Sequence, residues 1–415
     1  MLLFNFKNKM MQTITPNINK HMIHAEDLVF LGGENGLKLL INMFKQLYIR
    51  LKLDDETVNI NISVKYDGSP AVFAWSEFPG FKSYGIAIKS IFAKNPKILY
   101  NEDDIEKYYG TQKDLAIKLK LLLKYVPELN FPKGEIWQGD FLFDKDTLID
   151  EGLKYSFHPN TIIYKILKDS DIGEKISKSD IGIVWHTKYK GTSLSDIYAL
   201  YNININDLNF IDKVFMFEPS ITMLKDLNII TRKEALEFMN LLLDIEIKYF
   251  KLDLNNNYKN LLLDKELINY LITFQNYIII HNIKINNFID YLEEFMNYID
   301  NKLQKEIDSR KTEKGKNLII EKKQLILDKI EYNDSICNIV EIMQEITKLK
   351  HMFIEKLNNN GIFETYLTTD NITFIPTKDE GFVISDITGN IIKLINRNNF
   401  SFANFSSDIS KGWSK

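Results

Sequence analysis

Residues 58–75 read Val-Asn-Ile-Asn-Ile-Ser-Val-Lys-Tyr-Asp-Gly-Ser-Pro-Ala-Val-Phe-Ala-Trp. The residues before Lys65 and those after Pro70 are rich in β-branched and aromatic side chains, which predicts two strands. Asp67-Gly68 is a strong turn dipeptide and predicts a tight connection between them. Lys65 would then stand at the end of a buried strand, where it can present its amine to a pocket. An exposed hairpin turn without a chemical role also fits these residues.

The composition limits the classes of protein that need to be considered. A chain of 415 residues predicts two or three domains, and hydrophobic residues at 45% suffice for sizeable cores. The net charge of −4 provides no global basic field, so nucleic-acid binding would need a local patch. The single cysteine, Cys337, excludes a disulfide framework and fits a reducing, cytoplasmic location. No run of 18 apolar residues is present, so no membrane partner is expected.

Three regions differ in texture and predict an α+β fold. Residues 1–205 mix strand-like runs with two helices, at 34–51 and 103–125, and hold most of the glycines and prolines. Residues 206–359 are poor in glycine and carry Leu and Ile at helical spacing, with the last helix at 316–356. Residues 360–415 return to short strands. We therefore expect a helical, separable insertion, with the terminal strands completing the sheet of the first region.

Charged and aromatic residues recur on the predicted strands. Glu135 follows a glycine at the start of the run 134–143, and Asp140 in the same run is a competing acid. Glu380 precedes Gly381 and a β-branched strand, and Lys393 lies 13 residues later on the next strand. Two further strands carry aromatic side chains, Tyr164 and Trp185. Each of these patterns is common by itself, and each also fits an ordinary core strand or a solvated turn.

In combination, these residues resemble the covalent nucleotidyltransferases, the superfamily of polynucleotide ligases and mRNA capping enzymes. Lys65-x-Asp67-Gly68 resembles motif I, and the strands with Glu135, Glu380 and Lys393 resemble motifs III, IV and V in the same order. Tyr164 and Trp185 compete for the base-stacking position of motif IIIa. The resemblance covers residues 55–200 and 370–405. It implies an antiparallel-sheet, ATP-grasp-like ligase adenylation domain.

The resemblance also implies a role for each residue. Lys65 would attack the α-phosphate of ATP and form a lysyl-AMP intermediate, and Lys393 would contact that phosphate. Glu135 and Glu380 would hold Mg²⁺ and the ribose. An attacking lysine must be neutral, so we expect burial and a nearby cation to lower the pKa of Lys65 by about three units. Both Glu380 and Lys393 should lie within ~10 Å of Lys65. The other residues expected around the nucleotide are Val64, Asp67, Gly68, Tyr164, Trp185 and Arg397.

These assignments predict an ATP-dependent polynucleotide ligase. RNA is favoured over DNA as the nucleic-acid partner because only 22 residues follow Lys393, too few for the C-terminal barrel of DNA ligases. The abundance of Asn and Ile suggests a phage protein that acts in the host cytoplasm. Ile395 stands where family ligases place a second lysine, and Ser69-Pro70 where many place an arginine. A catalytically silent nucleotide- or RNA-binding protein and a capping-type guanylyltransferase therefore remain as alternatives.

Overall fold

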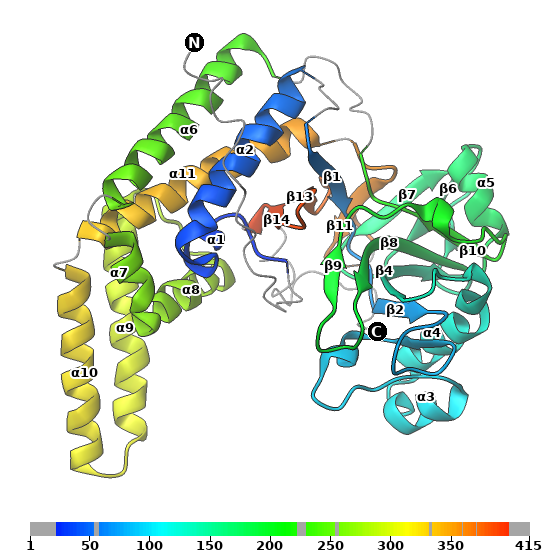
Figure 1. Cartoon of the computed structure of the whole chain (residues 1–415), viewed down its shortest axis with the longest axis horizontal. Helices are drawn as coiled ribbons and strands as arrows, with labels where there is room; N and C mark the ends of the chain where they lie inside the picture. The colour runs from blue at the N-terminus through cyan, green and yellow to red at the C-terminus, as the bar shows by residue number, and fades with distance from the viewer. Residues whose placement is uncertain are drawn as a thin grey trace.

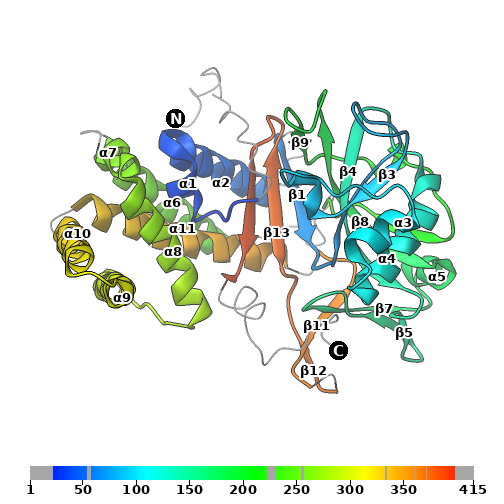
Figure 2. The same ribbon diagram turned by 90° about the horizontal axis from the view of Figure 1, so that it is seen from below.

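The fold is α+β, with mainly antiparallel sheets and a helical region (Figure 1). The computed structural model describes residues 22–53, 58–221, 230–253, 257–331, 334–358, 360–370 and 372–397. Figure 2 shows one small sheet, sheet A, standing between the helices on one side and two further sheets on the other. Sheet A therefore contacts both halves of the molecule.

Sheet A joins strands from the two ends of the chain. Its order is β1–β13–β14, and both pairings are antiparallel. Lys65 pairs with Gly381, and Val383 pairs with Lys393. The expected completion of the first region's sheet by the terminal strands is therefore present. The bounds of the strands are β1 Ile60–Lys65, β13 Gly381–Asp386 and β14 Ile391–Ile395.

Sheet B is built entirely from residues 71–217. Its order is β10–β8–β4–β2–β3, with β9 paired to β8, and only the β10–β8 pairing is parallel. After β10, the segment 219–221 pairs with β1 on the edge opposite β13, which joins sheets A and B. The strands are β2 Ala71–Trp75, β3 Gly85–Ala87, β4 Glu135–Asp144, β8 Ile181–Lys190, β9 Tyr198–Leu200 and β10 Val214–Phe217.

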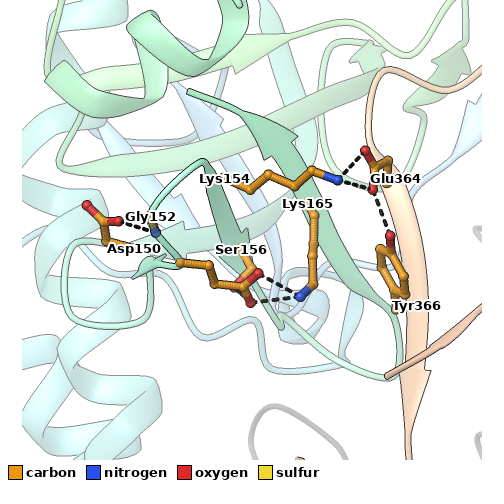
Figure 3. Close-up of polar contacts among 8 residues, drawn as sticks. Asp150, Gly152, Lys154, Ser156, Lys165, Glu364 and Tyr366 are labelled. Carbon is orange, nitrogen blue, oxygen red and sulfur yellow. Dashed lines mark hydrogen bonds and ion pairs between the residues drawn. The ribbon is translucent and has the colours of Figure 1, made fainter. Parts of the chain in front are cut away.

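Sheet C also combines both ends of the chain, in the order β12–β11–β7–β6–β5. Lys154 on β6 forms an ion pair with Glu364 on β11 at 2.6 Å, and Lys165 on β7 pairs with Glu151 at 2.7 Å (Figure 3). Both of these lysines are thus neutralised by neighbouring carboxylates. The strands are β5 Ile149–Asp150, β6 Lys154–Phe157, β7 Ile163–Leu167, β11 Glu364–Thr368 and β12 Phe374–Pro376.

Two of the expected long helices are divided. The run expected as one helix at 103–125 is interrupted at Gly110, which caps the first of two helices. The run at 316–356 forms two helices: the first packs on α9 as a helical hairpin, and the second packs on α6 (Figure 1). In the described residues no helix is both long and apolar enough to cross a membrane.

The α-helices are α1 Leu28–Leu31, α2 Gly36–Leu53, α3 Glu102–Tyr109, α4 Lys113–Tyr125, α5 Asp171–Lys178, α6 Arg232–Asp253, α7 Asn257–Leu263, α8 Lys265–Ile280, α9 Phe288–Ser309, α10 Glu313–Glu331 and α11 Asp334–Leu357. Short 3₁₀ helices cover Gly33–Asn35, Lys89–Phe92, Val126–Leu129 and Ile205–Asp207.

The helical region, expected from composition to be a separable insertion, shares its hydrophobic core with sheet A. One hydrophobic core contains side chains of α2, α6, α8 and α11 together with those of β1, β13 and β14. The β-rich part also extends beyond residue 205, because β10 belongs to sheet B and the first helix of the region, α6, begins at Arg232. Sheet A therefore depends on the helices for one side of its packing.

Candidate functional site

The two faces of sheet A have different surroundings because side chains alternate along its strands. Ile62, Val64, Phe382, Ile384, Ile392 and Leu394 are buried in the core shared with the helices. Ser63 pairs with Val383 and Val383 with Lys393, so these residues share the opposite face with Lys65. That face lines a pocket against sheet B. Val64, expected at the nucleotide, belongs to this core and is also among the residues that line the pocket.

Lys65 and Glu380 are in direct contact. The pairing of Lys65 with Gly381 brings the preceding residue, Glu380, beside the amine, and Nζ lies 2.5 Å from Oε2. Burial disfavours the charged amine and by itself would lower its pKa. The negative charges of Glu380, Asp67 and Asp140 have the larger effect, so the pKa of Lys65 is raised. This is opposite to the lowered pKa expected from the sequence. Burial raises the pKa of Glu380 to about 7, although Lys65 opposes this shift.

Lys393 is the second cation on this face. It lies on β14 two strands from Lys65, and burial, together with Lys65 and Arg397, lowers its pKa to about 8 against the attraction of Glu380. Residues 23–25 run parallel to β14, with hydrogen bonds from Lys393 N to Ile23 O and from Ala25 N to Lys393 O. The backbone that carries Lys393 is thereby held on both sides.

Gly68 allows the loop after Lys65 to lie against β4. A Cβ at this position would be 2.6 Å from Cβ of Asp140 and 2.8 Å from the carbonyl oxygen of Phe141. Hydrogen bonds from Ser69 N to Phe141 O and from Phe141 N to Pro70 O fasten the loop to the strand. The close approach places Asp140 in the pocket, where its carboxylate contributes to the raised pKa of Lys65.

Glu135, the first choice for the motif III acid, lies elsewhere on β4. It is five residues from Asp140, which corresponds to about 16 Å along a strand. Its carboxylate accepts a hydrogen bond from Trp137 Nε1 at 2.8 Å and pairs with Lys190 at 2.9 Å. Of the two acids considered from the sequence, the structure brings Asp140, and not Glu135, to Lys65.

Asp67 fixes the loop to a neighbouring turn. Its carboxylate accepts hydrogen bonds from Asn160 Nδ2 and Thr161 N, both at 2.7 Å, and from Ile162 N at 3.1 Å. Its own backbone N–H donates to Tyr164 Oη at 2.6 Å. The carboxylate is buried and already carries three donors. Asp67 therefore acts on the position of Lys65 through the loop.

We expect Asp67→Ala to lower the free energy of unfolding by about 2–4 kcal/mol. The truncation leaves the buried N–H groups of Thr161 and Ile162 without an acceptor, and each such loss costs about 1–3 kcal/mol. Asp67→Asn keeps an acceptor oxygen and should cost less. Urea unfolding followed by circular dichroism measures both variants, and equal stability of Asp67→Ala and wild type would contradict this role.

Neither aromatic candidate for base stacking faces the pocket. The Tyr164 ring is buried against Phe157 and Phe363, with centroids 5.4 and 5.7 Å away. Trp185 is buried against Phe131 and Trp137 in the core that α3 and α4 share with sheet B. Its neighbours on β8, Val184 and His186, line the pocket instead, because they lie on the other face of the strand.

His186 is a pocket residue that the motif comparison missed. Its Nε2 lies 3.6 Å from Asp140 Oδ2, and its Nδ1 is 2.8 Å from Thr187 Oγ1. The strand alternation could have identified it once Trp185 was assigned to the core.

Arg397 points toward the helices and not into the pocket. It donates to Asp27 Oδ1 at 2.9 Å and to Asn276 Oδ1 at 2.7 Å. Glu26, next to Asp27, forms a buried ion pair with Lys350 of α11 at 2.8 Å. These contacts tie the end of β14 to α8 and α11. The end of the segment that the resemblance covers, residues 398–405, lies outside the described residues.

The pocket is small, and Asp140 is the one acid in its described lining, whereas Glu380 reaches it only through its contact with Lys65. Its volume is about 40 Å³, room for little more than one water molecule, whereas ligand sites usually measure 300–1,000 Å³. Its lining includes Met22, Ser63, Lys65, Asp140, His186 and Tyr201. Among the described residues no group of three or more His, Cys, Asp or Glu side chains could hold a metal ion. Glu380 and Asp140 still fit Mg²⁺, which binds through one or two carboxylates and completes its shell with water and phosphate.

Comparison with known proteins identifies a family but no activity. No curated protein and no solved structure matches the chain. The match to a family description covers residues 19–409, which includes sheets A, B and C and the helical region. The chain belongs to DUF6267, a family of unknown function.

Proposed function

We propose that this protein is a ligase-type nucleotidyltransferase that transfers AMP from ATP to Lys65 and then to a polynucleotide end. One observation carries the proposal: Lys65 and Lys393, 328 positions apart in the chain, lie on one face of one three-stranded sheet, and Glu380, the residue before β13, contacts Lys65. An accidental hairpin turn at Asp67-Gly68 would not require this convergence. The nucleotidyltransferase fold is part of the same proposal.

Each residue has a defined task in this reaction. The Lys65 ammonium first loses one proton to solvent. A bond then forms between the neutral Nζ and the α-phosphorus while the bond to pyrophosphate breaks, and the nitrogen loses its second proton to solvent. Lys393 neutralises charge on the α-phosphate as a point cation. Glu380 and Asp140 would hold Mg²⁺, which supplies neutralisation of the leaving pyrophosphate. Asp67 and Gly68 keep the loop, and with it the amine, against β4.

The reaction requires two changes from the arrangement described above. Lys65 must give up its contact with Glu380, because the ion pair keeps the amine protonated. The pocket must also widen, because a nucleotide is far larger than 40 Å³. Met22 and Tyr201 line the pocket, lie outside the strands of sheets A and B, and are the side chains that would have to move.

The second candidate is a catalytically silent protein that keeps a ligase-like scaffold. Two observations favour it: the small pocket, and the buried Ile395 at the position of a second motif V lysine. In such a protein the Lys65–Glu380 contact would be a structural ion pair. It predicts that the chain forms no covalent adduct with any nucleotide.

One labelling experiment separates these functions. The full chain is incubated with Mg²⁺ and ATP or GTP labelled at the α-phosphate, then denatured and separated by electrophoresis. A label from ATP that is lost in acid or hydroxylamine supports the proposal. A label from GTP alone supports the capping-type guanylyltransferase, and no label from either supports the silent protein.

We expect Asp140→Asn to slow adduct formation by roughly 10²–10³-fold, the loss found when one charge-stabilising group is removed from an active site. Glu135→Gln should leave the rate within a few-fold of wild type, because Glu135 faces Lys188 and Lys190 and not Lys65. Single-turnover labelling measures both rates. The reverse result would return the motif III role to Glu135.

A further inference from the structure

Helix α6 has two apolar faces, and among the described residues one of them packs against other helices while the other stays exposed. Ala235, Phe238, Leu242, Ile245 and Tyr249 are buried, and α6 packs on α2 and α11. A second set lies about 130° away around the helix at 3.6 residues per turn. This set, here called the outer stripe, consists of Leu236, Met239, Leu243, Ile247 and Phe250.

The outer stripe is open to solvent along the helix. Its five side chains are between 42% and 62% exposed. A large side chain has a surface of about 150–250 Å². At these exposed fractions the five side chains together present roughly 500 Å² of apolar surface, and patches of this size are often functional. The stripe covers about 80° of the helix, as narrow as a coiled-coil seam, which suits a single partner helix. Figure 1 shows α6 at the outer edge of the helical region.

The spacing of the outer stripe is symmetric about its centre. Successive members are separated by three, four, four and three residues, so the pattern reads identically in both directions from Leu243. Two antiparallel α6 helices would therefore match apolar side chains at every position: Leu236 against Phe250, Met239 against Ile247, and Leu243 against itself. A two-fold interface requires this self-complementarity, and a foreign helix does not.

We propose that α6 is the docking surface for a second copy of this chain, in an antiparallel two-fold dimer centred on Leu243. A groove of about 580 Å³ lies beside the outer stripe. Its lining combines Leu236, Leu243 and Ile247 of the stripe with polar residues of α6 and with Lys348 of α11, and it offers space for side chains of the partner helix. Two stripes together would bury roughly 1,000 Å² of apolar surface, and the polar rim brings the total to the size of a specific interface.

The charges beside the outer stripe agree with the same register. Lys251 of one copy falls within two residues of the position opposite Glu237 of the other. Asn240 and Asp244 lie beside the centre on the same side of the outer stripe. Neither carries a positive charge, and the side-chain amide of Asn240 in one copy can donate to Asp244 of the other.

Cysteine cross-linking tests the two-fold axis. In a Cys337→Ser background, Leu243→Cys should form a disulfide dimer of about twice 48.6 kDa under mild oxidation, because only this residue meets its own copy. Leu236→Cys alone should not cross-link, but a mixture of Leu236→Cys and Phe250→Cys chains should. Leu318→Cys, equally exposed on α10, is the control for random collision.

A second measurement does not depend on new cysteines. Light scattering after size exclusion should give a dimer for wild type and for Leu318→Glu, and a monomer for Leu243→Glu with unchanged circular dichroism. A wild-type chain that is monomeric at every concentration would overturn the proposal. So would a dimer that Leu243→Glu does not disturb, or equal cross-linking of Leu236→Cys and Leu243→Cys. None of these outcomes depends on nucleotidyl transfer.

Discussion

Lys65→Arg is expected to abolish the covalent label from ATP while the chain stays folded. Arginine keeps the positive charge and can retain the ion pair with Glu380, but its guanidinium stays protonated and cannot attack phosphorus. Lys65→Ala should abolish the label as well. In that variant Glu380 loses its partner in a buried site, so the arginine variant is the cleaner test. Electrophoresis after incubation with α-labelled ATP measures the adduct.

Two further variants serve as controls for Lys65→Arg. Lys94→Ala removes an exposed lysine of the same domain and should label like wild type. Lys393→Ala should slow labelling without eliminating Lys65 as the acceptor, since Lys393 contributes charge and not the new bond. Labelling of Lys65→Arg at the wild-type rate would show that another residue is the nucleophile, and it would end the assignment of motif I.

The sequence was sufficient to predict the strands that carry the site. The β-branched runs around Lys65, after Glu380 and around Lys393 form β1, β13 and β14 at nearly the expected bounds. The order of the motifs also led to the pairing of β13 with β1 across the helical region. These features follow from local composition and from a known order of motifs, and both can be read along a single chain.

Which side chains of a strand point toward the pocket could not be predicted from local composition or from the order of the motifs. Trp185 and His186 are adjacent on β8, and which of them meets the pocket depends on the partner that covers each face. Glu135 and Asp140 share β4, and the choice between them depends on where the loop at Gly68 crosses the strand. These are long-range contacts, whereas the glycine-flanked pattern around Glu135 is local.

The division of the long helices was hidden for a similar reason. Gly110 and the residues after it interrupt a pattern whose apolar spacing continues on both sides, so a single helix fits the periodicity. Likewise, α10 and α11 carry equivalent spacing but pack on different partners, α9 and α6. They are separate helices because they pack on different partners, and the local apolar spacing does not indicate this difference.

Lys350→Met is expected to lower the free energy of unfolding by about 3–5 kcal/mol, the cost of leaving a buried charge without its partner. Lys350 is 1% exposed and Glu26 is 5% exposed, and their ion pair joins α11 to the segment that runs beside β14. Burial opposes the charge on Glu26, but Lys350 and Arg397 outweigh it and hold the pKa of Glu26 at about 2. Chemical unfolding measures the loss.

The double variant Lys350→Met/Glu26→Leu distinguishes a lost ion pair from a lost packing contact. Removal of both charges leaves no unpaired group, so most of the stability should return. Lys378→Met breaks an exposed pair with Glu355 and should change stability little. The buried pair belongs to the core that the helices share with sheet A, so its loss should unfold both parts in one transition. A separate, earlier transition of the helices would instead make the helical region an independent unit. Lys393 would then be held by its strand neighbours alone.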